Sequence, residues 1–175
     1  MALQSISAPP ACLTTRLARR LALLVLDVDG VLTDGGLWFG ARGEVLKRFH
    51  VRDGHGIKLL QAAGIPVALI SGRRSSAVAA RARELGVRLV LQGVADKSRA
   101  LDQLLRRLSI SDTQVACVGD DTPDIPLFVR AALAVAVRDA HPLARRAAHC
   151  RTELPGGHGA VREVVDWILA ARGRS

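Results

Sequence analysis

Tyrosine is absent from this sequence of 175 residues, and its only aromatic side chains belong to two tryptophans and three phenylalanines. A hydrophobic core must therefore be built from Leu, Val, Ile and Ala, a composition that suits an α/β protein with buried parallel strands. So few aromatic side chains also offer few platforms on which bases could stack, which weighs against a protein that binds single-stranded nucleic acid.

Cysteines and long apolar runs are scarce as well. Cys12, Cys117 and Cys150 form neither a metal-binding spacing nor an even set of disulfide partners, so we expect a reducing compartment, the cytoplasm. No apolar stretch approaches a membrane span, and we expect no membrane partner. The run at 21–26 follows several arginines, but it is too short for a signal peptide and ends in aspartates, so we interpret it as a buried strand.

Acidic residues are outnumbered, with 16 Asp and Glu against 25 Lys and Arg, which gives a formal net charge of +9. A charge of this sign can indicate nucleic-acid binding. The arginines, however, are scattered over several predicted helices and form no basic stripe. We therefore expect an anionic small substrate and no nucleic-acid partner.

The chain has the length of one domain, and 49% hydrophobic with 23% charged residues is typical of a globular protein. We expect a tail and a short lead-in helix over 1–20 and a single domain over 21–172. Strand-like and helix-like segments alternate after residue 54, which predicts a Rossmann-like three-layer sandwich with a central parallel sheet. The expected strands are 22–27, 67–70, 87–91, 115–118 and 133–137, and the expected helices are 57–63, 75–85, 97–108, 125–130, one opening at Pro142, and 160–172.

Residues 37–51 predict a β-hairpin, because strand-like runs at 37–39 and 45–51 flank the turn at 40–43. The hairpin is unusually apolar and includes Trp38, Phe39 and Phe49. It cannot bury these side chains by itself, so it either packs on its own domain or joins an interface between subunits.

Asp27 and Asp29 stand at the exit of the first strand, two residues apart, so both side chains lie on one side of the backbone and can address one ligand. Alone, this pair is a weak signal. Further polar clusters follow the later strands, and ligands of such sheets bind at the carboxyl ends of the strands. These clusters are Ser71-Gly72-Arg73, Asp96-Lys97 and Gly119-Asp120-Asp121 with Asp124. Together they predict a site for Mg²⁺ and a phosphate group.

Each cluster has a simpler explanation, since Ser71 and Asp96 can be helix caps and Lys97 a solvated helix residue. Their joint occurrence after successive strands makes that reading improbable. The set resembles, in order, the four motifs of the haloacid dehalogenase-like hydrolases. The resemblance extends to the 3-deoxy-D-manno-octulosonate 8-phosphate phosphatase family over about residues 24–169. It is carried by the stretches 27–35 (DVDGVLTDG), 47–49 (KRF), 52–57 (RDGHGI), 70–73 (ISGR), 84–86 (ELG), 92–93 (QG), 96–97 (DK), 139–142 (DAHP) and 156–164 (GGHGAVREV).

The resemblance implies a phosphatase in which Asp27 attacks phosphorus as the nucleophile and Asp29 acts as general acid and then general base. Mg²⁺ would be held by the Asp27 carboxylate, the Asp29 main-chain carbonyl and Asp120. Asp121 and Asp124 would lie behind these ligands and orient water molecules or Lys97, while Ser71 and Lys97 would bind the phosphoryl oxygens.

No cap domain is expected, because only the hairpin and one helix separate Asp29 from Ser71. In the resembling family the hairpins assemble a homotetramer whose neighbouring subunits cover the site. The resemblance further implies a substrate pocket formed by Asp29, His50, Val51, Arg52, Asp53, Gly54, Lys58, Arg73, Arg81 and Lys97. The few residues after the last predicted helix leave a contribution of the tail to a neighbour's site open, and the roles of His50 and His55 stay open as well.

The expected function is hydrolysis of 3-deoxy-D-manno-octulosonate 8-phosphate to the sugar acid and phosphate, a step in lipopolysaccharide precursor synthesis. Alternatives are a phosphatase for a related nine-carbon sugar acid phosphate or for many sugar phosphates, and a non-catalytic regulatory subunit. The complete acid set argues against the last, since a scaffold needs neither Asp27 nor Lys97.

Overall fold

A computed structural model of the protein describes residues 8–173. The first seven residues of the expected tail, and residues 174–175, lie outside this range. In chain order the elements are α1 (Thr15–Arg20), β1 (Leu23–Leu26), β2 (Trp38–Gly40), β3 (Gly43–Leu46), α2 (Val51–Ala62), β4 (Val67–Ser71), α3 (Ser76–Leu85), β5 (Leu89–Gln92), α4 (Lys97–Leu108), the 3₁₀ turn η1 (Asp112–Gln114), β6 (Val115–Gly119), the 3₁₀ turn η2 (Thr122–Asp124), α5 (Ile125–Phe128), β7 (Leu133–Ala136), α6 (Pro142–Ala147), β8 (Cys150–Arg151) and α7 (Ala160–Gly173).

Six strands form one sheet in the order β5-β4-β1-β6-β7-β8, and every pairing in it is parallel. β1 lies in the middle and pairs with β4 on one side and β6 on the other, so Leu26 faces both Leu69 and Val118 in register. All four β1 residues are fully buried. The predicted central parallel sheet is thus confirmed, and the residues that follow β1 emerge at its centre.

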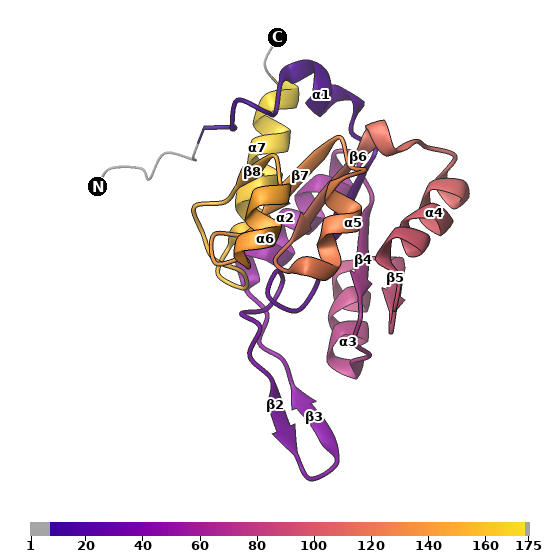
Figure 1. The fold of residues 1–175 in the computed structure, drawn as a ribbon, viewed down its shortest axis with the longest axis vertical. Helices are drawn as coiled ribbons and strands as arrows, with labels where there is room; N and C mark the ends of the chain where they lie inside the picture. Colours follow the sequence, from indigo (N-terminus) through magenta and orange to yellow (C-terminus); the bar gives the residue numbers. More distant parts are fainter. Residues whose placement is uncertain (1–7, 174–175) are drawn as a thin grey trace.

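Helices cover both faces of the sheet (Figure 1). On one face α2 packs against α7 and α3, and α7 also contacts α1; on the other, α5 contacts both α4 and α6. This arrangement is the expected three-layer sandwich. Aliphatic residues dominate the core, as the composition predicts, with Phe128 and Trp167 as its large aromatic members.

Helix α2 begins at Val51, whereas the sequence predicted a strand to residue 51 and a helix only from residue 57. His50 caps this helix, since its Nδ1 accepts a hydrogen bond from the Arg52 amide at 3.2 Å. The glycines in the first turns of α2 have low helix propensity, so the sequence did not indicate a helix there. Packing favours glycine at both positions, because a Cβ on Gly54 would lie 2.2 Å from the Arg81 guanidinium and one on Gly56 would lie 3.1 Å from the Arg162 Cα, so these neighbours would have to shift. The two-residue strand β8 was also missed, being too short to leave a periodic pattern.

The hairpin β2–β3 extends away from the sheet, at the end opposite the described termini (Figure 1). Its apolar side chains face solvent in the single chain: Trp38 is 59% exposed and Phe39 62%. Between β1 and α2 the structure holds only this hairpin and its connections, and no cap domain. Among the described residues, no helix has the length and apolar character needed to cross a bilayer.

Candidate active site

An open cleft of about 340 Å³ lies at the carboxyl ends of β1, β4 and β6. Polar side chains predicted from the sequence share this cleft although they come from four separate segments. Its lining includes Asp27, Asp29, Ser71, Arg73, Lys97, Asp120, Asp121 and Asp124. The parallel sheet therefore brings the four sequence clusters to one place, as strands that end at a common edge require.

Lys97 lies among the carboxylates of this cleft. Its Nζ donates to Asp27 Oδ1 at 2.7 Å and to Asp124 Oδ1 at 2.6 Å, and the Lys97 side chain is only 6% exposed. Burial lowers the pKa of Lys97, but the charges of Asp27 and Asp124 outweigh it, so the net shift is upward. Lys97 is thus a permanent ammonium beside Asp27.

Asp124 is occupied on both oxygens. One accepts from Lys97, and the other accepts from the backbone amides of Asp120 at 3.0 Å and Asp121 at 3.3 Å. Gly119 makes this possible, because a Cβ there would lie 2.5 Å from the Asp124 carboxylate. Asp124 therefore orients Lys97 and the turn after β6, which agrees with the supporting role expected of it.

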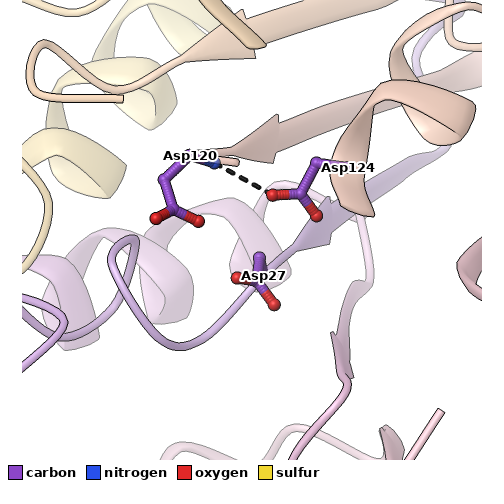
Figure 2. Close-up of side chains that lie close together, drawn as sticks. All are labelled: Asp27, Asp120 and Asp124. Carbon is purple, nitrogen blue, oxygen red and sulfur yellow. Dashed lines mark hydrogen bonds between the residues drawn. The ribbon is translucent and has the colours of Figure 1, made fainter. Parts of the chain in front are cut away.

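Asp27 and Asp120 keep oxygens for another partner. Ligand atoms of Asp27, Asp120 and Asp124 lie within 4.8 Å of one another (Figure 2). Burial, together with the Asp124 charge, raises the pKa of Asp27 to about 6. Burial and the charges of Asp27 and Asp124 raise the pKa of Asp120 to about 8. One buried ammonium does not balance these acids, so the cluster has the oxygen donors and the excess negative charge that suit Mg²⁺.

The turn after Asp29 packs closely against the Asp120 carboxylate. Gly30 has φ +86°, and a Cβ there would come within 2.1 Å of the Asp120 carboxylate. A second glycine turn packs against the turn after Asp29. A Cβ on Gly156 would lie 1.7 Å from the Gly30 carbonyl oxygen, and the Gly157 amide donates to the Val31 carbonyl at 2.9 Å.

Asp139 holds this supporting turn, since it accepts from the Gly156 amide at 2.9 Å. Nearby, the His141 amide donates to the Asp120 carbonyl at 2.7 Å. The stretches 139–142 and 156–159 that contributed to the family resemblance thus support the backbone of the acid cluster from the far side.

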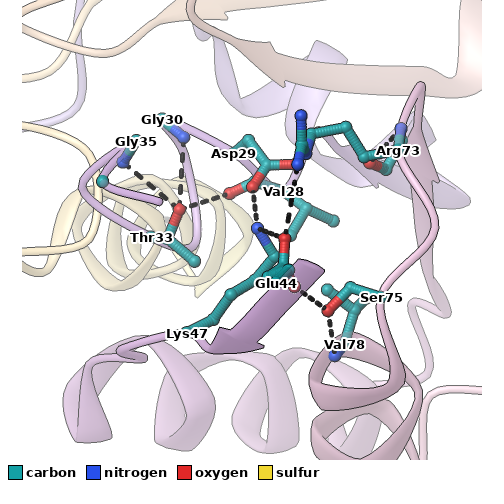
Figure 3. Close-up of polar contacts among 12 residues, drawn as sticks. Val28, Asp29, Gly30, Thr33, Gly35, Glu44, Lys47, Arg73, Ser75 and Val78 are labelled. Atoms are coloured by element: carbon teal, nitrogen blue, oxygen red, sulfur yellow. Dashed lines mark hydrogen bonds and ion pairs between the residues drawn. The ribbon is translucent and has the colours of Figure 1, made fainter. Parts of the chain in front are cut away.

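Asp29 is partly open to the cleft and forms an ion pair with Lys47 (Figure 3). Lys47 is also 3.0 Å from Glu44, a hairpin residue. Neither Lys47 nor Glu44 was predicted to have a role in the site. Lys47 belonged to a stretch that carried the resemblance, but only the fold shows that it reaches Asp29.

Ser71 is buried at the end of β4, where its Oγ accepts from the Arg73 amide at 3.2 Å. Arg73 itself points along the cleft toward the hairpin, with its guanidinium 5.9 Å from the Phe39 ring centre and 3.6 Å from Glu44. Asp121 lies at the rim, is largely exposed, and caps η2 through the Thr122 amide at 2.6 Å.

Several residues predicted to bind substrate lie outside the cleft of their own chain. His50, Gly54 and Arg81 line a separate, mostly apolar hollow with Phe49. Arg81 pairs with Glu84 at 2.8 Å and stacks over Phe49. Val51, Arg52 and Lys58 are exposed on α2. These positions touch substrate only if a neighbouring chain's site comes to them.

Asp53 was also expected to line the substrate pocket. Its side chain is buried and accepts from the Gly159 amide at 3.2 Å and the Arg162 amide at 2.8 Å, at the start of α7. Burial raises the pKa of Asp53 although these amides oppose the shift. In this structure the Asp53 carboxylate fastens α2 to α7.

The site combines a buried carboxylate beside a fixed ammonium, a second carboxylate at the cleft surface, and a cation-binding acid pair. Asp27 can attack an electrophile, since Lys97 offsets charge without occupying both oxygens. Asp29 can exchange a proton with a bound group because it remains solvent-accessible. This set suits transfer of a phosphoryl group to a carboxylate.

Comparison with known proteins gives the same answer. The family profile described as haloacid dehalogenase-like hydrolase matches residues 87–163. The chain is 48% identical over 155 residues to the 3-deoxy-D-manno-octulosonate 8-phosphate phosphatase KdsC of Yersinia pestis, covering 89% of this chain and 83% of that protein. A crystal structure of the Yersinia pestis phosphatase has a TM-score of 0.88 at 46% identity and covers 91% of this chain and 86% of that one.

A further solved relative carries ligands. The 3-deoxy-D-manno-octulosonate 8-phosphate phosphatase from Moraxella catarrhalis, in complex with magnesium ion, phosphate ion and KDO, has a TM-score of 0.87 at 38% identity and covers 90% of this chain and 91% of that one. The expected recognition is confirmed over nearly the whole chain: it belongs to the 3-deoxy-D-manno-octulosonate 8-phosphate phosphatase family of haloacid dehalogenase-like hydrolases.

Proposed function

We propose that this protein is a Mg²⁺-dependent phosphoric monoester hydrolase that converts 3-deoxy-D-manno-octulosonate 8-phosphate to the sugar acid and phosphate. The observation that carries the proposal is the placement of Lys97 between Asp27 and Asp124, with Asp120 beside them. The relatives' names and the magnesium, phosphate and KDO in the Moraxella catarrhalis complex support the substrate. The sugar acid that this reaction releases would be a lipopolysaccharide precursor. We propose that the reaction takes place in the cytoplasm.

In the first half-reaction, an Asp27 oxygen forms a bond to phosphorus while the bond from phosphorus to the sugar oxygen breaks. Asp29 gives its proton to the departing sugar oxygen, which leaves as an alcohol. Lys97 and Ser71 bind the phosphoryl oxygens, and the buried ammonium stabilises charge in the transition state.

In the second half-reaction, Asp29 takes a proton from a water molecule while the oxygen of that water bonds to phosphorus. The acyl phosphate bond breaks, and Asp27 returns to a carboxylate as phosphate departs. The partial exposure of Asp29 allows both the sugar oxygen and the water to reach the same carboxyl group in turn.

Mg²⁺ would be held by the Asp27 carboxylate, the Asp29 main-chain carbonyl and Asp120, and when bound it supplies positive charge to the phosphoryl oxygens. Asp121 and Asp124 would stay outside this set. Asp124 is already committed to Lys97 and two backbone amides, so its part is to fix their positions.

Substrate recognition and assembly belong together in this proposal. Arg73 lines the cleft and offers a guanidinium to the sugar's carboxylate. His50, Val51, Arg52, Gly54, Lys58 and Arg81 would serve a neighbour's cleft in a homotetramer joined through the exposed hairpins. Sedimentation tests the assembly: a stable monomer in solution would contradict it.

A panel of phosphate-release assays with Mg²⁺ tests the substrate. We expect kcat/KM for 3-deoxy-D-manno-octulosonate 8-phosphate to exceed that for a nine-carbon sugar acid phosphate and for hexose phosphates by at least about tenfold, because binding energy must come from the sugar acid. Equal efficiency on all of them would favour a broad sugar phosphatase. No turnover of any would favour a non-catalytic regulatory subunit.

A further inference from the structure

Lys47 is a buried cation whose position is explained by nothing in the mechanism so far. Its side chain is fully shielded from solvent, yet it ends in contact with Oδ1 of Asp29, a residue that lines the cleft. An ammonium in such a place is costly unless it is paired. Two carboxylates pair it, Asp29 and Glu44.

Glu44 in turn is held firmly. Its Oε1 accepts from the Ser75 hydroxyl at 2.5 Å, and Ser75 is the residue that caps helix α3 through the Val78 amide. Burial raises the pKa of Glu44, but the Ser75 hydroxyl and the Lys47 ammonium outweigh it and hold the pKa below its usual range. A line of contacts therefore runs from the start of α3 through Ser75, Glu44 and Lys47 to Asp29 (Figure 3).

Asp29 lies in a turn, so no strand pairing of its own backbone fixes the direction of its side chain. It follows the end of β1 and precedes Gly30, and its side chain is 21% exposed. The contact from Lys47 is to Oδ1, which leaves Oδ2 for the proton. A general acid must be held within hydrogen-bond reach of the departing oxygen, since small displacements slow proton transfer.

We propose that Lys47, anchored by Glu44, is the positioning residue of the general acid: it aims the Asp29 carboxyl at the leaving sugar oxygen. The proposal rests on the proposed function. Lys47 touches neither substrate nor phosphorus in this scheme and acts only through Asp29. The base of the hairpin is thereby part of the catalytic apparatus of its own chain.

The leaving group distinguishes aiming from general support. A sugar alkoxide is a poor leaving group and needs the Asp29 proton, whereas p-nitrophenolate departs as a stabilised anion without it. Since kcat/KM reports the steps up to the first departure of the leaving group, comparing the two substrates isolates the acid's contribution. We expect Lys47→Met to lower kcat/KM for the sugar acid phosphate by about 10- to 100-fold and to leave that for p-nitrophenyl phosphate within about threefold.

Two further variants make the test specific. Glu44→Gln, which keeps the shape of the side chain, should lower the ratio of the two kcat/KM values in the same direction, by about three- to tenfold; it also carries the test if Lys47→Met fails to fold. Arg48→Met is the matched control. Arg48 is the next cation along the chain but pairs with Asp34 at 3.2 Å, so its removal should leave the ratio unchanged.

A double-mutant cycle completes the test. If Lys47 acts through Asp29, adding Lys47→Met to Asp29→Asn causes no further loss on the sugar acid phosphate. The positioning role would be overturned if the losses in kcat/KM of the two single variants multiplied in the double variant. It would also be overturned if Lys47→Met lowered kcat/KM equally for both substrates, or if Lys47→Met and Glu44→Gln left the ratio of the two kcat/KM values unchanged. Failure of the proposed function looks different, because then the unmutated protein itself would not hydrolyse the sugar acid phosphate.

Discussion

Lys97 bridges the two carboxylates Asp27 and Asp124, with its Nζ 2.7 Å from the first and 2.6 Å from the second. The three side chains come from the end of β1, the start of α4 and η2, so only the folded sheet brings them together. Asp124 is itself tied to the backbone of the turn after β6. The bridge therefore ties Asp27, the proposed nucleophile, to the backbone of that turn.

Replacement of Lys97 by methionine should damage both chemistry and stability. In the proposed mechanism it removes the charge that stabilises the transferring phosphoryl group, so kcat should fall by at least about 100-fold. It also leaves buried carboxylates without their cation, which should lower the free energy of unfolding by about 3 kcal/mol in metal-free protein, measured by urea titration. Preserved kcat in Lys97→Met would show that the phosphoryl oxygens are bound elsewhere.

Gly30→Ala should disable the cation site. The new methyl group would lie 2.1 Å from the Asp120 carboxylate and on a backbone with φ +86°, so Asp120 must move. We expect the concentration of Mg²⁺ needed for half-maximal activity to rise by at least about tenfold. Gly43→Ala is the control, because Gly43 also has positive φ, +107°, but open space around it. A similar effect of both variants would assign the loss to backbone strain alone.

Stability of the metal-free protein should fall as pH rises. Asp27 and Asp120 have pKa values raised to about 6 and about 8 from 3.8, so the folded state binds their protons more tightly than the unfolded state does. The stability that these protons provide is complete below about pH 4 and is lost as pH rises through the folded values. Mg²⁺ replaces the protons, so its stabilising effect should be larger at pH 8 than at pH 6.

Thermal unfolding with EDTA and with saturating MgCl₂ at the two pH values measures this difference. In Asp120→Asn most of the pH dependence of the Mg²⁺ effect should vanish. A Mg²⁺ effect of the same size at pH 6 and pH 8 would mean that these acids do not hold the ion.

Asp53→Ala should reduce stability without a selective effect on substrate binding. Its carboxylate caps the start of α7 from α2, and removing it leaves two buried amides without acceptors. The expected loss is about 1–3 kcal/mol by urea titration, with KM unchanged. Asp166→Ala removes a carboxylate that pairs with Arg162 within α7, and should cost less than about 1 kcal/mol. A raised KM with unchanged stability would restore Asp53 to the substrate pocket.

Much of the fold was predictable because its signals are local. Buried strands separated by capped helices mark the sheet, and Gly86 and Asp96 end and begin helices where predicted. The convergence of Asp27, Ser71, Lys97 and Asp120 follows from topology, since parallel strands end at one edge. The start of α2 was mispredicted because its glycines pack against Arg81 and α7, which are distant in sequence.

Contacts between side chains of different segments could not be predicted from the sequence. Nothing in the spacing of Lys47 and Asp29 indicates that they meet, because the hairpin that separates them could have turned either way. Asp53 lies 106 residues before Gly159, and its contact with the start of α7 could not be foreseen from the sequence. Long-range pairings of this kind depend on the complete packing arrangement.

In the proposed mechanism Asp27 is the nucleophile of a Mg²⁺-dependent phosphatase. The most direct test is the rate of phosphate release from 3-deoxy-D-manno-octulosonate 8-phosphate by the unmutated protein and by Asp27→Asn, both with saturating Mg²⁺ and both shown by circular dichroism to be folded. Loss of the attacking oxygen should lower kcat by at least about 10³-fold. Turnover by Asp27→Asn within tenfold of the unmutated protein would contradict the covalent mechanism.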